Sequence, residues 1–201
     1  DLSKDVYANF YFSKDTIESD FVGYKILYYQ RSREGRKAEW VELTPDLIPV
    51  NDTVCTVDVT RISTGQVAVA AYDSAKNVSY SMTHVMRVSD LMAPEAPANF
   101  RYEIVDNKAG VVKLTWTAPS ADVDYYEVAY ANDTTHQFML CPMPGGSLLR
   151  DTTYIDTLAV DVNQKYIYYK VRAIDFATNE GEYTAPLQVL RPSMIIPDAP
   201  H

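Results

Sequence analysis

The sequence has few of the residues from which disulfide frameworks and metal centres are built. Its 201 residues include two cysteines, three histidines and seven glycines. Cys55 and Cys141 lie in different halves of the chain, so their spacing predicts no disulfide framework. His84, His136 and His201 are far apart in the sequence, whereas a zinc site needs three or four converging ligands. We therefore expect neither a metal site nor a disulfide-stabilised domain.

Other signatures of function are also missing. The sequence contains no glycine-rich phosphate loop and no G-x-S-x-G motif, so it predicts no cofactor and no enzymatic activity. No apolar run approaches the roughly 20 residues that a membrane-spanning helix needs, so no membrane insertion is expected in this segment. The net charge is −9, which argues against binding of a nucleic-acid backbone by counterion release.

The composition that remains favours β-structure. Hydrophobic residues make up 47% of the chain, so a buried core is expected. The 16 tyrosines, with abundant valine and threonine, favour strands, where aromatic and β-branched side chains fit a half-buried pleated surface. A β-sandwich commonly has about 100 residues, so the length suits two such domains.

An internal repeat supports two similar domains. "GYKILYY" (23–29) aligns with "YYEVAYA" (125–131), and "VAVAAYDSAKN" (67–77) aligns with "YYKVRAIDFATN" (168–179), both at an offset of 102. The aligned pairs include Tyr24 and Tyr126, Ile26 and Val128, Asp73 and Asp175, and Asn77 and Asn179. One offset kept over about 50 residues indicates a true repeat.

Each repeat shows the alternation expected of half-buried strands. In "VVKLTWT" (111–117), Val112, Leu114 and Trp116 point to one face, and the residues between them point to the other. Turn residues follow, as in "ADVDYYE", where Asp122 and Asp124 are expected to be solvated, with a cation site or an acid/base pair as the alternative. Short alternating strands separated by turns predict a sandwich rather than crossover units.

The second repeat, "PEAPANF…GVVKLTWTAP…DYYEVAYA…TTYIDT…YYKVRAID…NEGEYTAP", resembles a fibronectin type III domain over essentially its whole length. The matching positions are Pro94, Pro97, Trp116, Tyr126, Val128, Val171, Ala173 and the segment 180–186. The resemblance implies a seven-stranded Greek-key sandwich. We therefore predict an all-β fold of two tandem immunoglobulin-like sandwiches of the fibronectin type III kind.

The first repeat departs from this pattern at its start. Its second strand is expected at "VYANFYF" (6–12), where Phe12 takes the core position of Trp116. Only 11 residues precede Phe12, so the first sandwich is expected to lack most of strand A, and upstream residues of a longer protein to complete it. The predicted domains are 1–91, incomplete at its N-terminus, and 92–193. Residues 194–201, with prolines spaced as in the earlier "PEAP", are expected to form a linker or the start of a further module.

Three aromatic residues are candidates for ligand contact. Trp40, Tyr125 and Tyr168 occupy outward positions, where flat rings could stack on a sugar or on a protein partner. The alternative is that they form ordinary cross-strand aromatic pairs, which stabilise a sheet by about 0.2–1 kcal/mol each.

A tripeptide of Asp, then Ser or Thr, then an aliphatic residue, Ala or Thr occurs six times. It resembles the O-glycosylation acceptor motif of exported proteins from some gut-associated Gram-negative bacteria. The acceptor residues would be Thr16, Thr53, Ser74, Thr134, Thr152 and Thr157. The alternative is turn chemistry, which also enriches Asp-Thr pairs. The motif favours an extracytoplasmic location: secreted, periplasmic or at the cell surface.

Together these features predict non-catalytic spacer or interaction modules within a larger extracytoplasmic bacterial multidomain protein. The proline of the linker "SDLMAP" favours an extended, semi-rigid connection. The expected partners are neighbouring domains of the same chain, with a glycan or protein ligand as a further possibility. The alternative function is that of glycan-binding or accessory modules of a polysaccharide-degrading enzyme.

Overall fold

The computed structural model describes residues 4–12, 20–31, 37–143 and 146–192. Strands form its regular structure, with no α-helix in these ranges and hence no helix that could span a membrane. The chain divides into two compact units, unit 1 (Asp1–Met92) and unit 2 (Ala93–His201). The predicted C-terminal linker or module start, residues 194–201, lies outside the described residues.

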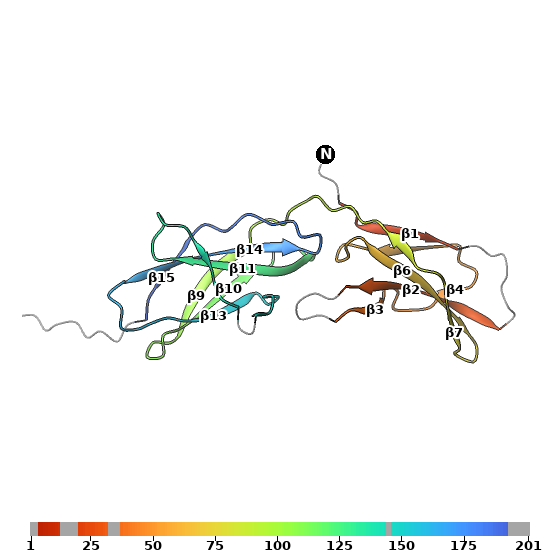
Figure 1. Ribbon diagram of the computed structural model, residues 1–201, viewed down its shortest axis with the longest axis horizontal. Coiled ribbons are helices and arrows are strands. Elements are labelled where there is room, and N and C mark those ends of the chain that lie inside the picture. The colour runs from red at the N-terminus through yellow and green to blue at the C-terminus, as the bar shows by residue number, and fades with distance from the viewer. Residues whose placement is uncertain (1–3, 13–19, 32–36, 144–145, 193–201) are drawn as a thin grey trace, which may run out of the picture. The chain divides into compact units, whose positions relative to one another are not determined.

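Unit 2 consists of two antiparallel sheets (Figure 1). Three strands form the first sheet in the order β13-β10-β9, namely β9 (Ala98–Asp106), β10 (Val111–Thr117) and β13 (Thr153–Thr157). Four strands form the second in the order β12-β11-β14-β15, namely β11 (Val123–Ala131), β12 (Met139–Leu140), β14 (Tyr166–Asp175) and β15 (Leu187–Leu190). A division into three and four strands is typical of immunoglobulin-like sandwiches.

The core of unit 2 lies between these sheets. On β10 the predicted inward residues are buried: Val112 and Leu114 are fully inaccessible and Trp116 is 5% exposed. The Trp116 ring meets Tyr126 of the facing sheet edge-on, at 5.2 Å between ring centroids. The alternation of the sequence therefore predicted both the strand and its inward face correctly.

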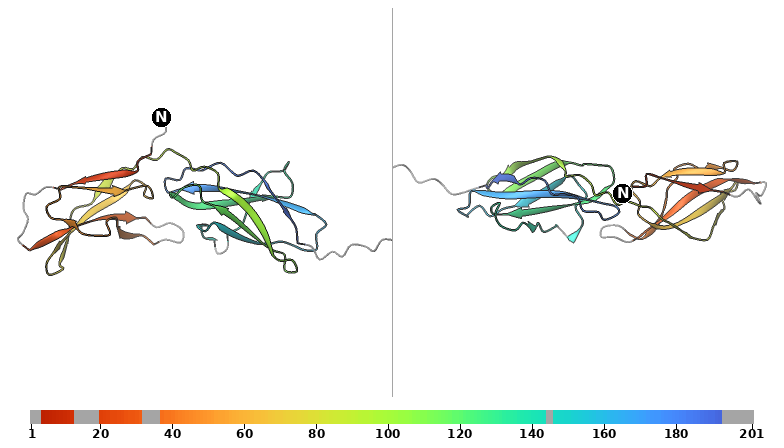
Figure 2. Two further views of the ribbon diagram at one scale, coloured as in Figure 1. Left: turned by 180° about the vertical axis from the view of Figure 1, so that it is seen from behind. Right: turned by 90° about the horizontal axis from the view of Figure 1, so that it is seen from above.

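Unit 1 repeats the arrangement with a smaller first sheet (Figure 2). That sheet pairs β1 (Tyr7–Tyr11) with β5 (Val54–Asp58). The second sheet has the order β3-β2-β6-β7, from β2 (Phe21–Gln30), β3 (Glu39–Glu42), β6 (Gly65–Asp73) and β7 (Val78–Tyr80). Two short strands complete it, β4 (Ile48–Pro49) beside β2 and β8 (His84–Met86) beside β6. The chain is thus an all-β pair of sandwiches, as the sequence predicted.

Phe12 occupies the position in unit 1 that Trp116 occupies in unit 2. Its ring stacks on Tyr24 at 4.9 Å and 9° between planes, and Tyr24 is the residue aligned with Tyr126. In both cores, therefore, an aromatic residue at the end of one strand (β1 or β10) packs on a tyrosine of the next strand (β2 or β11).

The turn after the long central strand also repeats in detail. In unit 1 the Asp73 carboxylate accepts hydrogen bonds from the Asn77 backbone N–H and side-chain amide, both at 2.7 Å. In unit 2 Asp175 accepts the same two bonds from Asn179, at 2.8 and 2.9 Å. Lys76 and Thr178, one residue before each asparagine, have φ of 68° and 71°. An aspartate followed four residues later by an asparagine thus forms the same turn in both units.

Strand β1 has one side without a described partner. The backbone carbonyl of Val6 accepts a hydrogen bond from the Val59 N–H, and the Phe12 N–H donates to the Thr53 carbonyl. Even-numbered residues of this strand therefore direct their N–H and C=O groups toward β5. The backbone groups of Tyr7, Asn9 and Tyr11 therefore point to the other edge. In the described ranges no strand pairs there, whereas β9 covers this edge of β10 in unit 2.

The uncovered edge affects the core of unit 1. Ala8 and Phe10, on the inward face of β1, are only partly buried. Their counterparts on β10, Val112 and Leu114, are completely inaccessible, and Phe100 of β9 packs beside them at Trp116. The first sandwich therefore lacks strand A in the described part of the chain, as predicted.

Candidate ligand site

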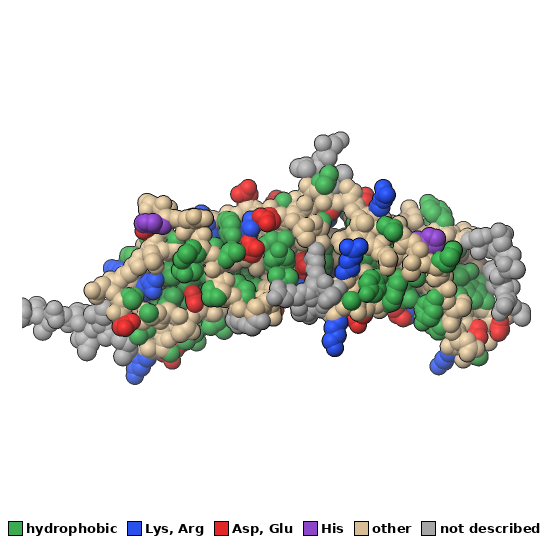
Figure 3. All heavy atoms as spheres, viewed as in Figure 1, with side chains coloured by type: hydrophobic (Ala, Val, Ile, Leu, Met, Phe, Trp, Pro, Cys, Tyr) green, Lys and Arg blue, Asp and Glu red, His purple; other side chains and the backbone are tan. Residues whose placement is uncertain are grey.

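A hollow of about 420 Å³ lies on the outer face of the larger sheet of unit 1. Hydrophobic side chains reach the surface over the part of this unit where β2, β3, β6 and β7 lie (Figure 3). Six residues line the hollow: Leu27, Trp40, Glu42, Ala68, Tyr72 and Tyr80. They come from all four of these strands, so the hollow exists only in the assembled sheet.

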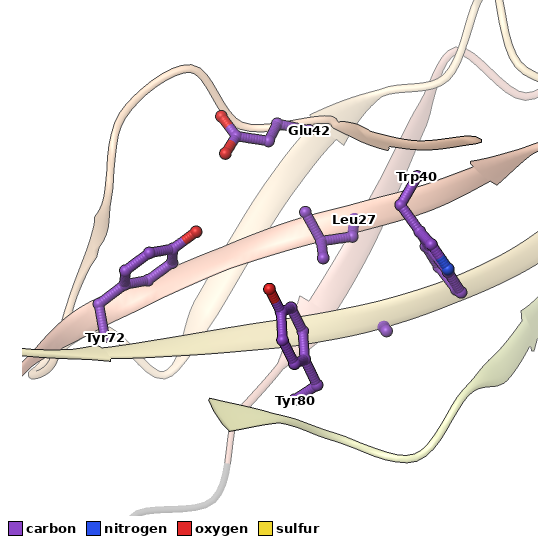
Figure 4. Close-up of a pocket in the computed structure, with 6 residues that line it drawn as sticks. Leu27, Trp40, Glu42, Tyr72 and Tyr80 are labelled. Carbon is purple, nitrogen blue, oxygen red and sulfur yellow. The ribbon is translucent and has the colours of Figure 1, made fainter. Parts of the chain in front are cut away.

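Strand register explains why this face is hollowed. Leu27 lies between Glu42 on β3 and Ala68 on β6, and Ala70 lies beside Tyr80 on β7. Small alanines thus form the middle of the face, while the larger rings stand around it. Figure 4 shows Trp40, Tyr72 and Tyr80 about Leu27, with both tyrosine hydroxyls on the side nearer Glu42. Small side chains between large aromatic ones leave the open volume.

The aromatic walls differ in how firmly they are held. Trp40 is 41% exposed and rests against Tyr29, its cross-strand neighbour, at 5.3 Å between centroids. Tyr80 is 67% exposed on the edge strand β7. Trp40 therefore presents one ring face that is positioned by the sheet, and Tyr80 a second that extends further into water.

A pair of opposite charges adjoins the rings. Lys25 Nζ lies 2.5 Å from Glu42 Oε2, and this hydrogen bond raises the pKa of Lys25 above its usual value. Tyr72 also lies near this ammonium group. Within the described residues the hydroxyls of Tyr72 and Tyr80 make no hydrogen bond. The site therefore combines apolar ring faces with a neutralised ion pair and two hydroxyl groups.

The corresponding face of unit 2 is filled instead. At the offset of 102, Lys170 and Arg172 stand where unit 1 has Ala68 and Ala70. Arg172 forms ion pairs with Glu127 at 2.7 Å and Glu180 at 2.5 Å, and lies 4.8 Å from the ring centroid of Tyr183. The hollow is therefore a property of the residues in unit 1 and does not follow from the sandwich fold.

The three predicted contact aromatics belong to two different units. Trp40 belongs to unit 1, and Tyr125 and Tyr168 belong to unit 2. On the β11–β14 pair, Tyr125 lies opposite Ile174 and Tyr168 opposite Ala131, six residues further along β11. That separation is about 20 Å along the strand, so these two tyrosines do not adjoin each other. Tyr168 instead accepts a hydrogen bond from Gln188 at 3.1 Å.

Sequence reasoning therefore found Trp40 but missed its neighbours in the hollow, Tyr72 and Tyr80. A signal for them was present in the repeat alignment. Outward positions that hold Lys170 and Arg172 in one repeat hold alanines in the other, and such a loss of volume marks a place where a face can open.

The proposed glycosylation residues lie mostly in exposed turns and strand ends. Thr53, Ser74, Thr134 and Thr157 are exposed, Thr152 is partly buried, and Thr16 lies outside the described residues. Asp133, before Thr134, accepts hydrogen bonds from Thr135 and from His136, which hold its pKa below the usual range. Turn chemistry thus operates at this position, and glycosylation stays a prediction.

The expectation that Asp122 and Asp124 are solvated is wrong. Asp122 is 5% exposed and Asp124 is 3% exposed. The Arg150 guanidinium lies 3.4 Å from the Asp124 carboxylate, and the Asp122 carbonyl accepts the Phe176 backbone N–H. The Asp124 carboxylate can be buried because Arg150, 26 residues further along the chain, supplies an opposite charge beside it.

No protein-family model matches the sequence, and no curated protein matches it. The chain is similar in structure to the FN1–FN3 domains of chicken CNTN1, with 14% identity, a TM-score of 0.41 and 94% of this chain covered. It spans 61% of the length of that chain. A two-domain fibronectin type III segment of chicken tenascin gives 14% identity and a TM-score of 0.41, with 94% of both chains covered. An Fn3-like protein from Clostridium thermocellum gives 21% identity and a TM-score of 0.40, over 55% of this chain and 100% of that chain.

Proposed function

We propose that the chain is a pair of non-catalytic, fibronectin type III-like modules that act as a spacer or interaction segment. The parent is a larger extracytoplasmic bacterial protein with several domains. The observation that carries the proposal is the mutual pairing of the strong polar groups in unit 2. Asp175 binds Asn179, Arg172 binds two glutamates on the sheet surface, and Tyr169 donates to Asp156 at 2.6 Å. These groups stabilise the fold by pairing with one another.

The open edge of β1 supports an interaction role. Its backbone N–H and C=O groups at Tyr7, Asn9 and Tyr11 have the geometry that an added antiparallel strand requires. Natural proteins usually cover such an edge, because an exposed strand edge pairs readily with other chains. A neighbouring domain of the same protein is the partner that we propose.

A spin-label distance measurement tests the spacer role. Labels would be placed at Ser74→Cys in unit 1 and Lys108→Cys in unit 2, both exposed positions, after replacing Cys55 and Cys141 by alanine. A semi-rigid spacer gives a narrow distance distribution that broadens when the linker proline Pro94 becomes glycine. A distribution equally broad before and after this change would contradict the spacer proposal.

The extracytoplasmic location needs a separate test. If exported protein carries sugar at the exposed Asp-Ser and Asp-Thr positions, its intact mass exceeds the sequence mass by whole hexose or related units. Replacing Thr53 and Thr134 by valine removes two of these increments. An intact mass equal to the sequence mass in protein isolated from its native host would contradict glycosylation.

A further inference from the structure

The hollow on unit 1 contains groups that single out one class of ligand. Its Trp40 and Tyr80 rings offer apolar faces, and Glu42 offers carboxylate oxygens beside the Lys25 ammonium group. Its volume of about 420 Å³ lies within the range of small-molecule pockets, about 300–1,000 Å³. A ligand that fills it must present an apolar surface and several hydrogen-bonding groups at once.

Charged ligands fit these groups poorly. An aromatic site with a free carboxylate would attract a cation, but Lys25 already neutralises Glu42 and would repel a second positive charge. An anion would meet the Glu42 carboxylate in a chain whose net charge is −9. A wholly apolar ligand would remove water from the ion pair without replacing its hydrogen bonds, which is costly.

We infer that this hollow binds a neutral saccharide. A sugar ring has one face of C–H groups that can lie on the Trp40 ring, and its hydroxyls can both donate to Glu42 and accept from Lys25. The hydroxyls of Tyr72 and Tyr80, which make no hydrogen bond among the described residues, can bind further sugar hydroxyls. Trp40 is the stacking platform, Tyr80 the second wall, and the Lys25–Glu42 pair the polar end of the site.

The comparison between repeats supports this assignment. Unit 2 keeps the same sheet but fills the face with Arg172 and its two glutamates, so it lacks the small residues that open the hollow. Ala68 and Ala70 make room for a ligand that long side chains would displace. The inference gives a site to the alternative function of glycan binding. A spacer needs no ligand, so the failure of one proposal leaves the other standing.

The test measures binding by the full chain to defined neutral sugars. Hexasaccharides of the cellulose, xylan, mannan and starch series and chitin oligomers would be titrated by isothermal titration calorimetry, because tryptophan fluorescence would lose its reporter at the site in Trp40→Ala. The insoluble parent polysaccharides would be tested by co-sedimentation. We expect saturable binding to at least one series, and at least a tenfold loss of affinity in Trp40→Ala. Binding to the polymer alone would indicate an extended chain as the ligand, and binding to both would indicate a short saccharide segment.

Two variants separate loss of the site from loss of the fold. Ala68→Lys imports the residue that unit 2 carries and fills the hollow without removing a ring, so it should abolish binding. Val54→Ala removes an apolar side chain that is 46% exposed on β5, in the other sheet of unit 1, so it should leave affinity unchanged. Circular dichroism and thermal unfolding verify that each variant folds, and Tyr80→Phe keeps the ring while removing one hydroxyl.

Several results would overturn the inference. One is the absence of binding to every neutral sugar at about 10 mM, a concentration that detects even millimolar affinity. A second is equal affinity in the parent, Trp40→Ala and Ala68→Lys proteins. A third is binding only to polygalacturonate or only to a trimethylammonium ligand, which would assign the hollow to charged ligands.

Discussion

Replacing Tyr169 by phenylalanine is expected to lower the free energy of unfolding of unit 2 by about 2 kcal/mol. Tyr169 is completely inaccessible, and its hydroxyl donates to Asp156 Oδ2 at 2.6 Å. Phenylalanine keeps the ring and its packing, so only this bond is lost. Hydrogen bonds to charged groups contribute about 1.5–3 kcal/mol, and Asp156 is partly open to water, which favours the lower part of that range.

The two tryptophans make this measurement specific to one unit. Trp40 lies in unit 1 and Trp116 lies in the core of unit 2, so a Trp40→Phe background leaves one reporter of unit 2 unfolding. Urea denaturation followed by its fluorescence gives the free energy of unfolding. The same loss lowers the melting temperature by about 10 °C for a domain of this size.

A double-mutant cycle identifies the bond as the cause. In an Asp156→Ala background, Tyr169→Phe should cost about 1.5 kcal/mol less than in the parent, because its acceptor is already gone. Unit 1 has Val67 at the position of Tyr169, and it has Val57 opposite Ala8 where unit 2 has Asp156 opposite Val112. The sandwich can therefore fold without this bond, and the variants should remain folded. A loss below about 0.5 kcal/mol in the single variant, or additive effects in the cycle, would refute the reasoning.

Three further predictions concern unit 2. Burial raises the pKa of the Cys141 thiol to about 12 and raises that of Tyr169, so the unfolded chain loses these protons at lower pH than the folded unit. The free energy of unfolding of unit 2 should therefore be constant below about pH 9 with respect to these groups and should fall as the pH rises toward 12. A urea midpoint that stays constant over this interval would contradict the prediction. Gly110→Ala should lower stability by about 2 kcal/mol or more, because φ is 75° and the new Cβ would meet the Leu158 carbonyl; an unchanged melting temperature would disprove this. Asn179→Ala should cost about 1.5 kcal/mol by removing a bond to a buried carboxylate, and urea denaturation showing no loss would count against that role.

Much of the fold follows from local patterns in the sequence. The strand Val111–Thr117, its inward face, and the equivalence of Phe12 with Trp116 were all predicted. They depend on alternation with a period of two and on the repeat, both of which can be read from the order of residues.

The candidate site was only partly predictable. Trp40 was identified as an outward aromatic residue, but Tyr72 and Tyr80 join it through cross-strand neighbours set by register. Asp122 and Asp124 were expected in water because their neighbours in sequence suggest a turn. The Asp124 carboxylate lies beside Arg150, and the Asp122 backbone carbonyl bonds Phe176, and the fold brings both partners from elsewhere in the chain.

The sequence by itself therefore determined the strands, the turns and the duplication, because side-chain alternation and turn chemistry act between residues close along the chain. Only the tertiary structure decided which outward side chains share a face and which carboxylates are buried. Those outcomes depend on contacts between distant strands. The hollow of unit 1 and the filled face of unit 2 show the difference, since the same fold with alanines or with long cations at two positions presents two different surfaces.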